Sequence, residues 1–119
     1  MRNKILIIYA HAQERDQLEQ FLQEIIEEGG ELFFADKREN GIAIIKKEHP
    51  QLVFLDSLLA GEDAKAWMHE GVRIIFMRHK NEYHHKEEDV VFKPLKSHQV
   101  LEKCRVWLGR EPVAQIPPM

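Results

Sequence analysis

The stretch Leu52–Asp56, whose sequence is LVFLD, decides the fold because four consecutive apolar residues run directly into a carboxylate. A short, continuous apolar run is typical of a strand that is buried on both faces, as in a parallel sheet. The stretch Lys4–Tyr9, with the sequence KILIIY, has the same character. We therefore predict that both stretches are strands of a parallel sheet with a layer of helices on each face.

Strands and helices alternate outward from this stretch. We predict further strands at residues 32–35, 72–77 and 90–92, and helices at residues 12–28, 41–48, 64–70 and 97–108. Segment 78–89 is polar throughout, so we expect a loop or one poorly packed helical turn there. The alternation implies right-handed crossovers and a doubly wound α/β sandwich with five parallel strands.

Length and composition restrict the function classes. The chain has 119 residues, enough for one domain, and a formal net charge of -3, which gives no electrostatic footprint for nucleic acid or a membrane surface. We expect a single domain at 1–110 and a flexible tail at 111–119, which contains Pro112, Pro117 and Pro118. Cys104 is the only cysteine, and no targeting or membrane-spanning stretch stands out, so we expect a cytoplasmic protein.

The functional positions follow from the sheet. Working groups of open parallel sheets lie at the carboxyl ends of the strands. The residues at these ends are Tyr9, Ala10, His11, Asp56, Arg78 and Lys93.

Three stretches together form a familiar pattern: the first strand Lys4–Ile8, the segment Leu52–Asp63 with Gly61 inside it, and Val91–Leu95 with its Lys93-Pro94 step. The chain resembles the CheY-like receiver domains of bacterial response regulators from Lys4 to Gly109. The resemblance implies a flavodoxin-like sheet with strand order 2-1-3-4-5, a cis Lys93-Pro94 bond, and Asp56 at the phosphoacceptor position. Because this chain is shorter between Asp56 and Lys93, we expect a shortened third helix and a reduced or absent fourth helix.

The departures from the family pattern bear on its chemistry. Receivers of the usual kind bind Mg²⁺ through an acidic pair after the first strand, but the matching positions here are Tyr9 and Ala10. Magnesium prefers carboxylate ligands, so we expect weak or absent Mg²⁺ binding and no other cofactor. The family's two switch positions hold Arg78 and Val90, in place of a hydroxyl and an aromatic residue. Arg78 and Lys93 are placed where both can pair with Asp56 permanently.

These departures favour a degenerate receiver, or pseudo-receiver, over an enzyme. We interpret the chain as a stand-alone, phosphorylation-independent protein-interaction module in two-component or phosphorelay signalling. Its partner would be a histidine kinase or a downstream signalling protein, and the module a monomer or weak dimer. In the family the binding surface is commonly built from the fourth helix, fifth strand and fifth helix, here residues 78–108. One alternative is a slow but genuine phosphoacceptor at Asp56, and a third is a metal or small-ligand binder on the same frame.

Other residues invite interpretations that we weigh against plainer ones. His79, His84 and His85 lie near three glutamates, but adjacent histidines point apart, so a solvated connection is the plainer interpretation and we predict no metal site. Cys104 lies on the apolar face of the last helix and is predicted to be a core residue. Trp67 is either a core residue or a partly exposed anchor for a partner.

Overall fold

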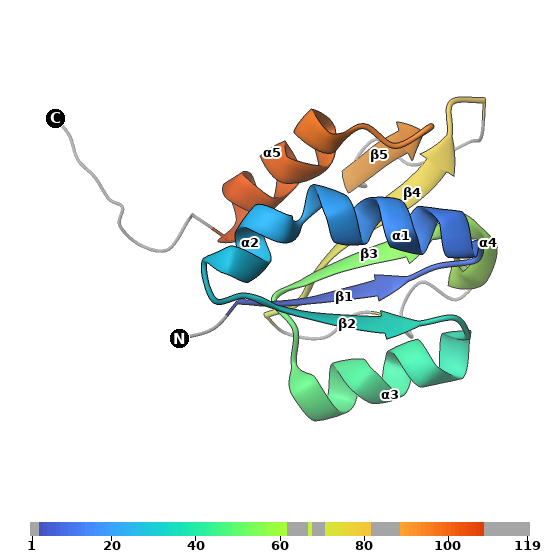
Figure 1. Ribbon diagram of the computed structural model, residues 1–119. Coiled ribbons are helices and arrows are strands. Elements are labelled where there is room, and N and C mark those ends of the chain that lie inside the picture. Colours follow the sequence, from blue (N-terminus) through green and yellow to red (C-terminus); the bar gives the residue numbers. More distant parts are fainter. Residues whose placement is uncertain (1–2, 62–66, 68–70, 82–88, 109–119) are drawn as a thin grey trace, which may run out of the picture.

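The computed structural model shows five parallel strands in one sheet, in the order β2-β1-β3-β4-β5 (Figure 1). The structure describes residues 3–61, 67, 71–81 and 89–108. The strands are β1 (Lys4–Ile8), β2 (Glu31–Ala35), β3 (Leu52–Asp56), β4 (Arg73–His79) and β5 (Asp89–Lys93). This is the predicted strand order, and β3 pairs with β1 on one side and β4 on the other. The Lys93-Pro94 bond is cis, as predicted.

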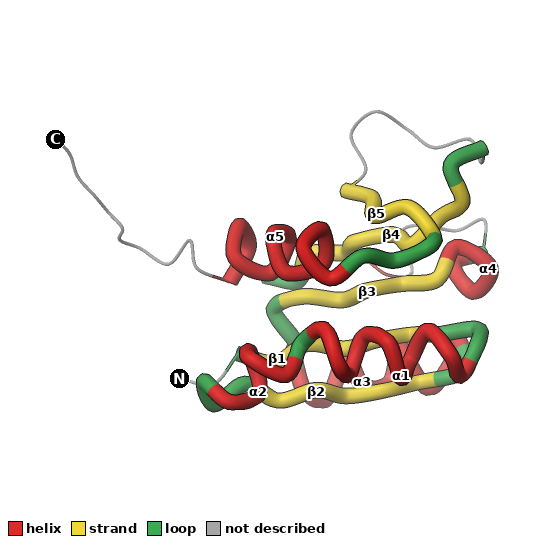
Figure 2. The backbone as a smooth tube through the Cα atoms, turned by 45° about the horizontal axis from the view of Figure 1, so that its top comes forward, coloured by secondary structure: helices red, strands yellow, loops and turns green. Residues whose placement is uncertain are grey.

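Helices cover both faces of the sheet, as the tube view makes clear (Figure 2). They are α1 (Ala12–Phe21), α2 (Gln23–Glu27), α3 (Arg38–Glu48), α4 (Ser57–Ala60) and α5 (Ser97–Leu108). Buried residues of α1, α2 and α5 pack on one face of the sheet, and those of α3 and α4 pack on the other. None of the described helices is long and apolar enough to span a bilayer.

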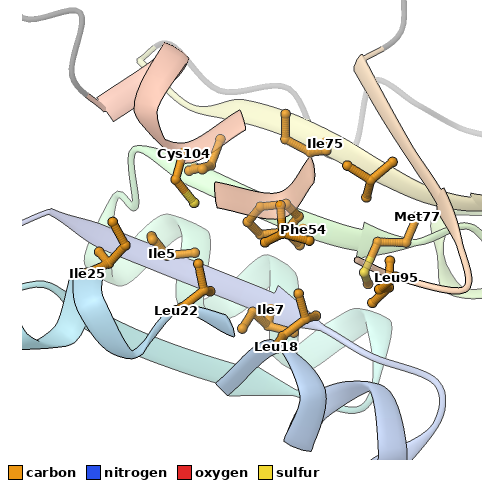
Figure 3. Close-up of a cluster of buried hydrophobic side chains, with 13 residues drawn as sticks. Ile5, Ile7, Leu18, Leu22, Ile25, Phe54, Ile75, Met77, Leu95 and Cys104 are labelled. Carbon is orange, nitrogen blue, oxygen red and sulfur yellow. The ribbon is translucent and has the colours of Figure 1, made fainter. Parts of the chain in front are cut away.

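The alternation of side chains along the strands divides the core in two. Phe54 is fully buried at the centre of the first half, close to Ile5, Ile7 and Leu18 (Figure 3). The neighbouring positions Leu6, Ile8, Val53 and Leu55 point to the second half, which also contains Trp67. Every residue of β3 is therefore buried, which explains why its sequence is continuously apolar up to Asp56.

The prediction of the first helix is wrong about its continuity. The prediction of a single helix at 12–28 is replaced by α1 and α2, with a break at Leu22, whose backbone angles are φ -97 and ψ 11. The Leu22 side chain is nonetheless fully buried, so the apolar spacing across the break remains close to that of one helix. Apolar periodicity reports which side chains are buried and is insensitive to a local change of backbone angle.

The helices around β3 also differ from expectation. The helix predicted at 41–48 is α3, which starts at Arg38 and not at 41, because its first turn is polar and carries no apolar signal. The short helix α4 follows β3 directly and was not predicted. Of the helix expected at 64–70 only Trp67 is described, while segment 82–88 and the tail at 111–119 lie outside the described residues.

Candidate functional site

Asp56 is a fully buried carboxylate at the carboxyl end of the central strand. Its Oδ1 accepts a hydrogen bond of 2.9 Å from the Leu58 backbone N–H, so that Asp56 caps α4. Its Oδ2 lies 2.8 Å from Lys93 Nζ. Both oxygens of this carboxylate are therefore engaged by the protein itself, in keeping with the rule that a buried charge must be paired.

Lys93 links Asp56 to a second carboxylate. Its side chain is only 6% exposed, and Nζ lies 2.8 Å from Asp56 Oδ2 and 2.9 Å from Glu14 Oε2. The three residues come from β3, the end of β5 and the first turn of α1. A single ammonium group thus joins three elements that are distant in the sequence, and we call Glu14, Asp56 and Lys93 the carboxyl-end cluster.

Glu14 is the member that the sequence prediction missed. It lies in the first turn of α1, where its backbone N–H donates to the His11 carbonyl oxygen, and its side chain is 15% exposed. Its spacing offers a signal, because Leu18, one helical turn later, is fully buried. Residues four apart lie on the same helix face, so Glu14 lies on the same face of α1 as Leu18, which faces the sheet.

Burial and pairing act in opposite directions on the ionisation of these groups. Burial alone raises the pKa of the Asp56 carboxyl, but hydrogen bonds with Lys93, the Leu58 N–H and Glu14 outweigh it and hold the pKa below its usual value. Burial raises the pKa of the Glu14 carboxyl above its usual value, and the neighbouring Asp56 carboxylate raises it further. The hydrogen bond between Glu14 and Lys93 lowers this pKa but does not cancel the rise. Burial alone lowers the pKa of Lys93, but its bonds to Asp56 and Glu14 raise it overall, so the ammonium stays charged.

Solved structures of other proteins show which known fold this chain has. The receiver domain of Ssk1 from Saccharomyces cerevisiae, solved with the phosphotransfer protein Ypd1, is 16% identical with a TM-score of 0.76, covering 96% of this chain and 94% of that one. A two-component response regulator from Clostridium difficile is 23% identical with a TM-score of 0.74, covering 93% and 99% of the two chains. The chain has the fold of a response regulator receiver domain. No protein-family model and no curated protein matches the sequence.

A third structure of the receiver fold was solved with a metal ion. The receiver domain of the sensor histidine kinase PA1611 from Pseudomonas aeruginosa contains magnesium coordinated in its active site cleft. It is 15% identical to this chain, with a TM-score of 0.72 and coverage of 92% and 99% of the two chains. At this identity the likeness concerns the fold, and the chemistry of the site must be argued from the residues present.

The remaining expected site residues surround the carboxyl-end cluster without joining its ion pairs. Tyr9 is half-buried, and its backbone N–H donates to the Ala35 carbonyl oxygen, while Ala10 adds no polar side chain. His11 is exposed and immediately precedes α1. We expected Arg78 beside Lys93 at Asp56, but the Arg78 guanidinium lies over the Phe76 ring, 4.8 Å from its centroid. Glu14 is the residue that completes the cluster.

Three further residues from the sequence analysis lie in the sheet or in the core. Val90 lies in β5 and pairs in register with Phe76. Trp67 is 1% exposed and its Nε1–H donates to the Ala60 carbonyl oxygen at 2.7 Å, so it is a core residue and not an exposed anchor. Cys104 is a core residue as well, since it is fully buried, and this burial raises the pKa of its thiol to about 12.

The histidine segment gives no further site among the described residues. In that part of the chain, no three His, Cys, Asp or Glu side chains are grouped so that they could hold a metal ion. His79 is exposed at the end of β4, opposite Lys93 in the register. His84 and His85 lie outside the described residues.

Proposed function

We propose that the chain is a receiver-type signalling domain that acts as a phosphorylation-independent protein-interaction module. One observation carries the proposal: Lys93 Nζ lies between the buried Asp56 carboxylate, at 2.8 Å, and the partly buried Glu14 carboxylate, at 2.9 Å. The site therefore contains its own cation. Such a domain would present a binding surface of fixed shape instead of one that phosphorylation alters.

The residues around Asp56 support this proposal. Phosphoryl transfer depends on cations that neutralise the charge developing on the phosphoryl group, usually with a metal among them. Tyr9 and Ala10 offer no carboxylate after β1, and both oxygens of Asp56 already accept hydrogen bonds. A phosphoryl group on Asp56 would have to share this carboxylate with the Leu58 N–H and the Lys93 ammonium. We therefore propose that Mg²⁺ binding is weak and that Asp56 is a structural carboxylate.

A comparison with one solved structure supports a partner class. The Ssk1 receiver domain was crystallised with the histidine phosphotransfer signalling protein Ypd1, for which Ssk1 is the downstream response regulator. We propose a partner of the same signalling class for this chain, either a histidine kinase or phosphotransfer protein or a downstream signalling protein.

The test is incubation of the purified chain with acetyl phosphate and Mg²⁺, followed by intact-mass measurement. The proposal predicts an unchanged mass and unchanged fluorescence of Trp67 and Trp107. The Asp56→Asn variant serves as the control for modification at other sites. A receiver domain that is known to accept phosphoryl groups shows that the donor is active.

A slow phosphoacceptor at Asp56 is the competing function, and one observation favours it. Pairing holds the pKa of Asp56 below its usual value, so the side chain is an ionised nucleophile with a cation beside it. This function predicts a mass gain of one phosphoryl group that disappears in Asp56→Asn. That result would overturn the interaction-module proposal.

A further inference from the structure

The charges of the carboxyl-end cluster do not balance when both acids are ionised. Glu14 and Asp56 then carry two negative charges, and Lys93 supplies one positive charge. The exposed fractions of the Glu14, Asp56 and Lys93 side chains are 15%, 0% and 6%, so water screens this excess poorly. An uncompensated buried charge is strongly unfavourable, and a carboxyl group in this position gains by binding a proton.

One oxygen of the cluster has an unused capacity. Glu14 Oε2 is bound to Lys93, but Glu14 Oε1 is buried and has no hydrogen-bond partner among the described residues. A carboxylate can only accept hydrogen bonds, whereas a protonated carboxyl group also donates one. Asp56 and Glu14 share the Lys93 ammonium, and the Asp56 charge raises the pKa of the Glu14 carboxyl. A proton on Glu14 would therefore remove the excess charge and provide a donor for Asp56.

The charged groups on neighbouring elements are engaged elsewhere. On α1, Arg15 stacks over the Phe34 ring at 4.6 Å and lies 3.7 Å from Asp16. On β4, Arg78 stacks over Phe76, and His79 is exposed at the strand end. His11, before α1, is exposed as well. Within the described part of the chain, the charges that act on Glu14 are those of Lys93, from β5, and Asp56, from β3.

We propose that Glu14 and Asp56 hold one proton between them, with Lys93 as their shared counter-charge, so that the cluster is a proton-binding site. Two carboxyl groups in one site ionise as a coupled pair, the second with difficulty. Asp56 has the lower affinity for the proton, because its carboxylate accepts hydrogen bonds from the Leu58 N–H and the Lys93 ammonium. The proton therefore resides on Glu14.

Loss of this proton would change the surface around the site. The bridge from Glu14 through Lys93 ties the start of α1 to the end of β5, and α4 begins at Asp56. Deprotonation leaves two like charges beside one shared cation, and their repulsion destabilises this junction. Partner binding at the carboxyl ends of the strands would then depend on pH. This consequence rests on the proposed interaction function, whereas the proton site itself is a property of the three side chains.

The test is a carbon-13 NMR titration of the side-chain carboxyl groups in the full chain. The proposal predicts that Glu14 titrates above the ordinary glutamate value of about 4.3. The Asp56 carboxyl and the Lys93 side chain should shift at the same midpoint. In Glu14→Gln that step should vanish from the Asp56 signal. In the matched control Glu48→Gln, which alters a glutamate paired with Lys4 at 3.1 Å, the step should remain.

Several outcomes would overturn the proposal. A Glu14 midpoint at or below the ordinary value would do so, as would an Asp56 signal that does not follow it. These measurements are made on the unaltered chain, so they do not depend on the folding of a variant. If Mg²⁺ shifts the midpoint markedly downward, a metal ion and not a proton balances the charge. A phosphoryl mass gain at Asp56 with the NMR step intact would overturn the proposed function and leave the proton site in place.

Discussion

The two ends of the sheet carry charge clusters of opposite design. At the carboxyl ends of the strands, one cation, Lys93, is shared by two acids. At the amino ends of β4 and β5, one acid, Asp89, is shared by two cations, Arg73 at 3.6 Å and Lys103 at 3.2 Å. Arg73 also stacks on the Trp107 ring at 3.6 Å, and we call these four residues the amino-end cluster.

The two clusters differ more in the exposure of their side chains than in their ion-pair distances. The Lys93 and Asp56 side chains are 6% and 0% exposed, whereas those of Arg73 and Lys103 are 45% and 30% exposed. Removing one partner from a buried pair leaves a charge that water cannot reach, but an exposed group regains its hydration. Similar ion-pair distances at the two ends therefore have different consequences, and the following changes test that difference from the largest effect to the smallest.

Lys93→Met should have the largest effect. It keeps most of the length of the side chain but leaves the partly buried Glu14 and the buried Asp56 without their cation. Loss of one partner from a buried ion pair typically destabilises a protein by about 3–5 kcal/mol. We expect a loss of this order in urea unfolding at pH 7, measured against Lys103→Met as the matched lysine in the amino-end cluster. Similar losses in the two variants would remove the distinction between the ends of the sheet.

Glu14→Gln should change how stability depends on pH. The raised pKa of Glu14 gives a stabilising contribution that is complete below its unfolded value of 4.5 and is lost as pH rises through the folded pKa. The unaltered chain should therefore lose stability over this window above pH 4.5, and Glu14→Gln should not. The measurement is urea unfolding at a series of pH values, with Glu48→Gln as control. A parallel pH profile for the chain and Glu14→Gln would contradict this account.

Asp56 should act in a separate window, at lower pH. Its pKa is held below 3.8, so its contribution is present above that value and is lost as pH falls through the folded pKa. Acid unfolding followed by circular dichroism should therefore be less steep in Asp56→Asn. An identical acid transition in this variant would show that the pairing with Lys93 is unimportant for acid stability.

Arg73→Met, in the amino-end cluster, should have a modest effect. An exposed cation on an aromatic face is worth about 0.5–1 kcal/mol, and the exposed contact with Asp89 adds little. We expect a loss within this range in urea unfolding, together with a change in Trp107 fluorescence, since the guanidinium lies on that ring. A loss as large as that of Lys93→Met would contradict the assignment of this cluster to the surface.

Lys103→Met should have the smallest effect. The Lys103 and Asp89 side chains are partly exposed, at 30% and 21%. Ion pairs near the surface contribute about 0–1 kcal/mol, and ~1 M salt screens most of that interaction. The difference in stability between this variant and the unaltered chain should therefore disappear in high salt. The deficit of Lys93→Met should persist under the same conditions, because water and salt do not reach its site.

The strands and two residues of the carboxyl-end cluster, Asp56 and Lys93, were predictable from the sequence for a physical reason. A strand that is buried on both faces must be continuously apolar, so Leu52–Asp56 and its counterparts stood out, and the residues that follow them mark the carboxyl ends. Asp56 and Lys93 were placed together on that basis. The helix α4 also had a signal, since Asp56 is a good N-cap and Gly61, with φ +74, ends the helix.

What escaped prediction depends on geometry that a pattern of residue types does not contain. Glu14 is one of several glutamates in the first helical segment, and its spacing from Leu18 indicates the face it lies on but not that its side chain reaches Lys93. Arg78 has the charge expected at Asp56, but its guanidinium stacks on Phe76. The break at Leu22 is invisible because the side chain stays buried while the backbone departs from the helix.

The most direct test of the central claim is a proton–nitrogen NMR spectrum of the chain before and after addition of Mg²⁺ and beryllium fluoride, a mimic of the phosphoryl group on carboxylates. If Lys93 and the Leu58 N–H permanently occupy Asp56, the backbone signals of Asp56, Leu58 and Lys93 will stay in place. Movement of these three signals that is absent in Asp56→Asn would contradict the claim and identify Asp56 as an acceptor.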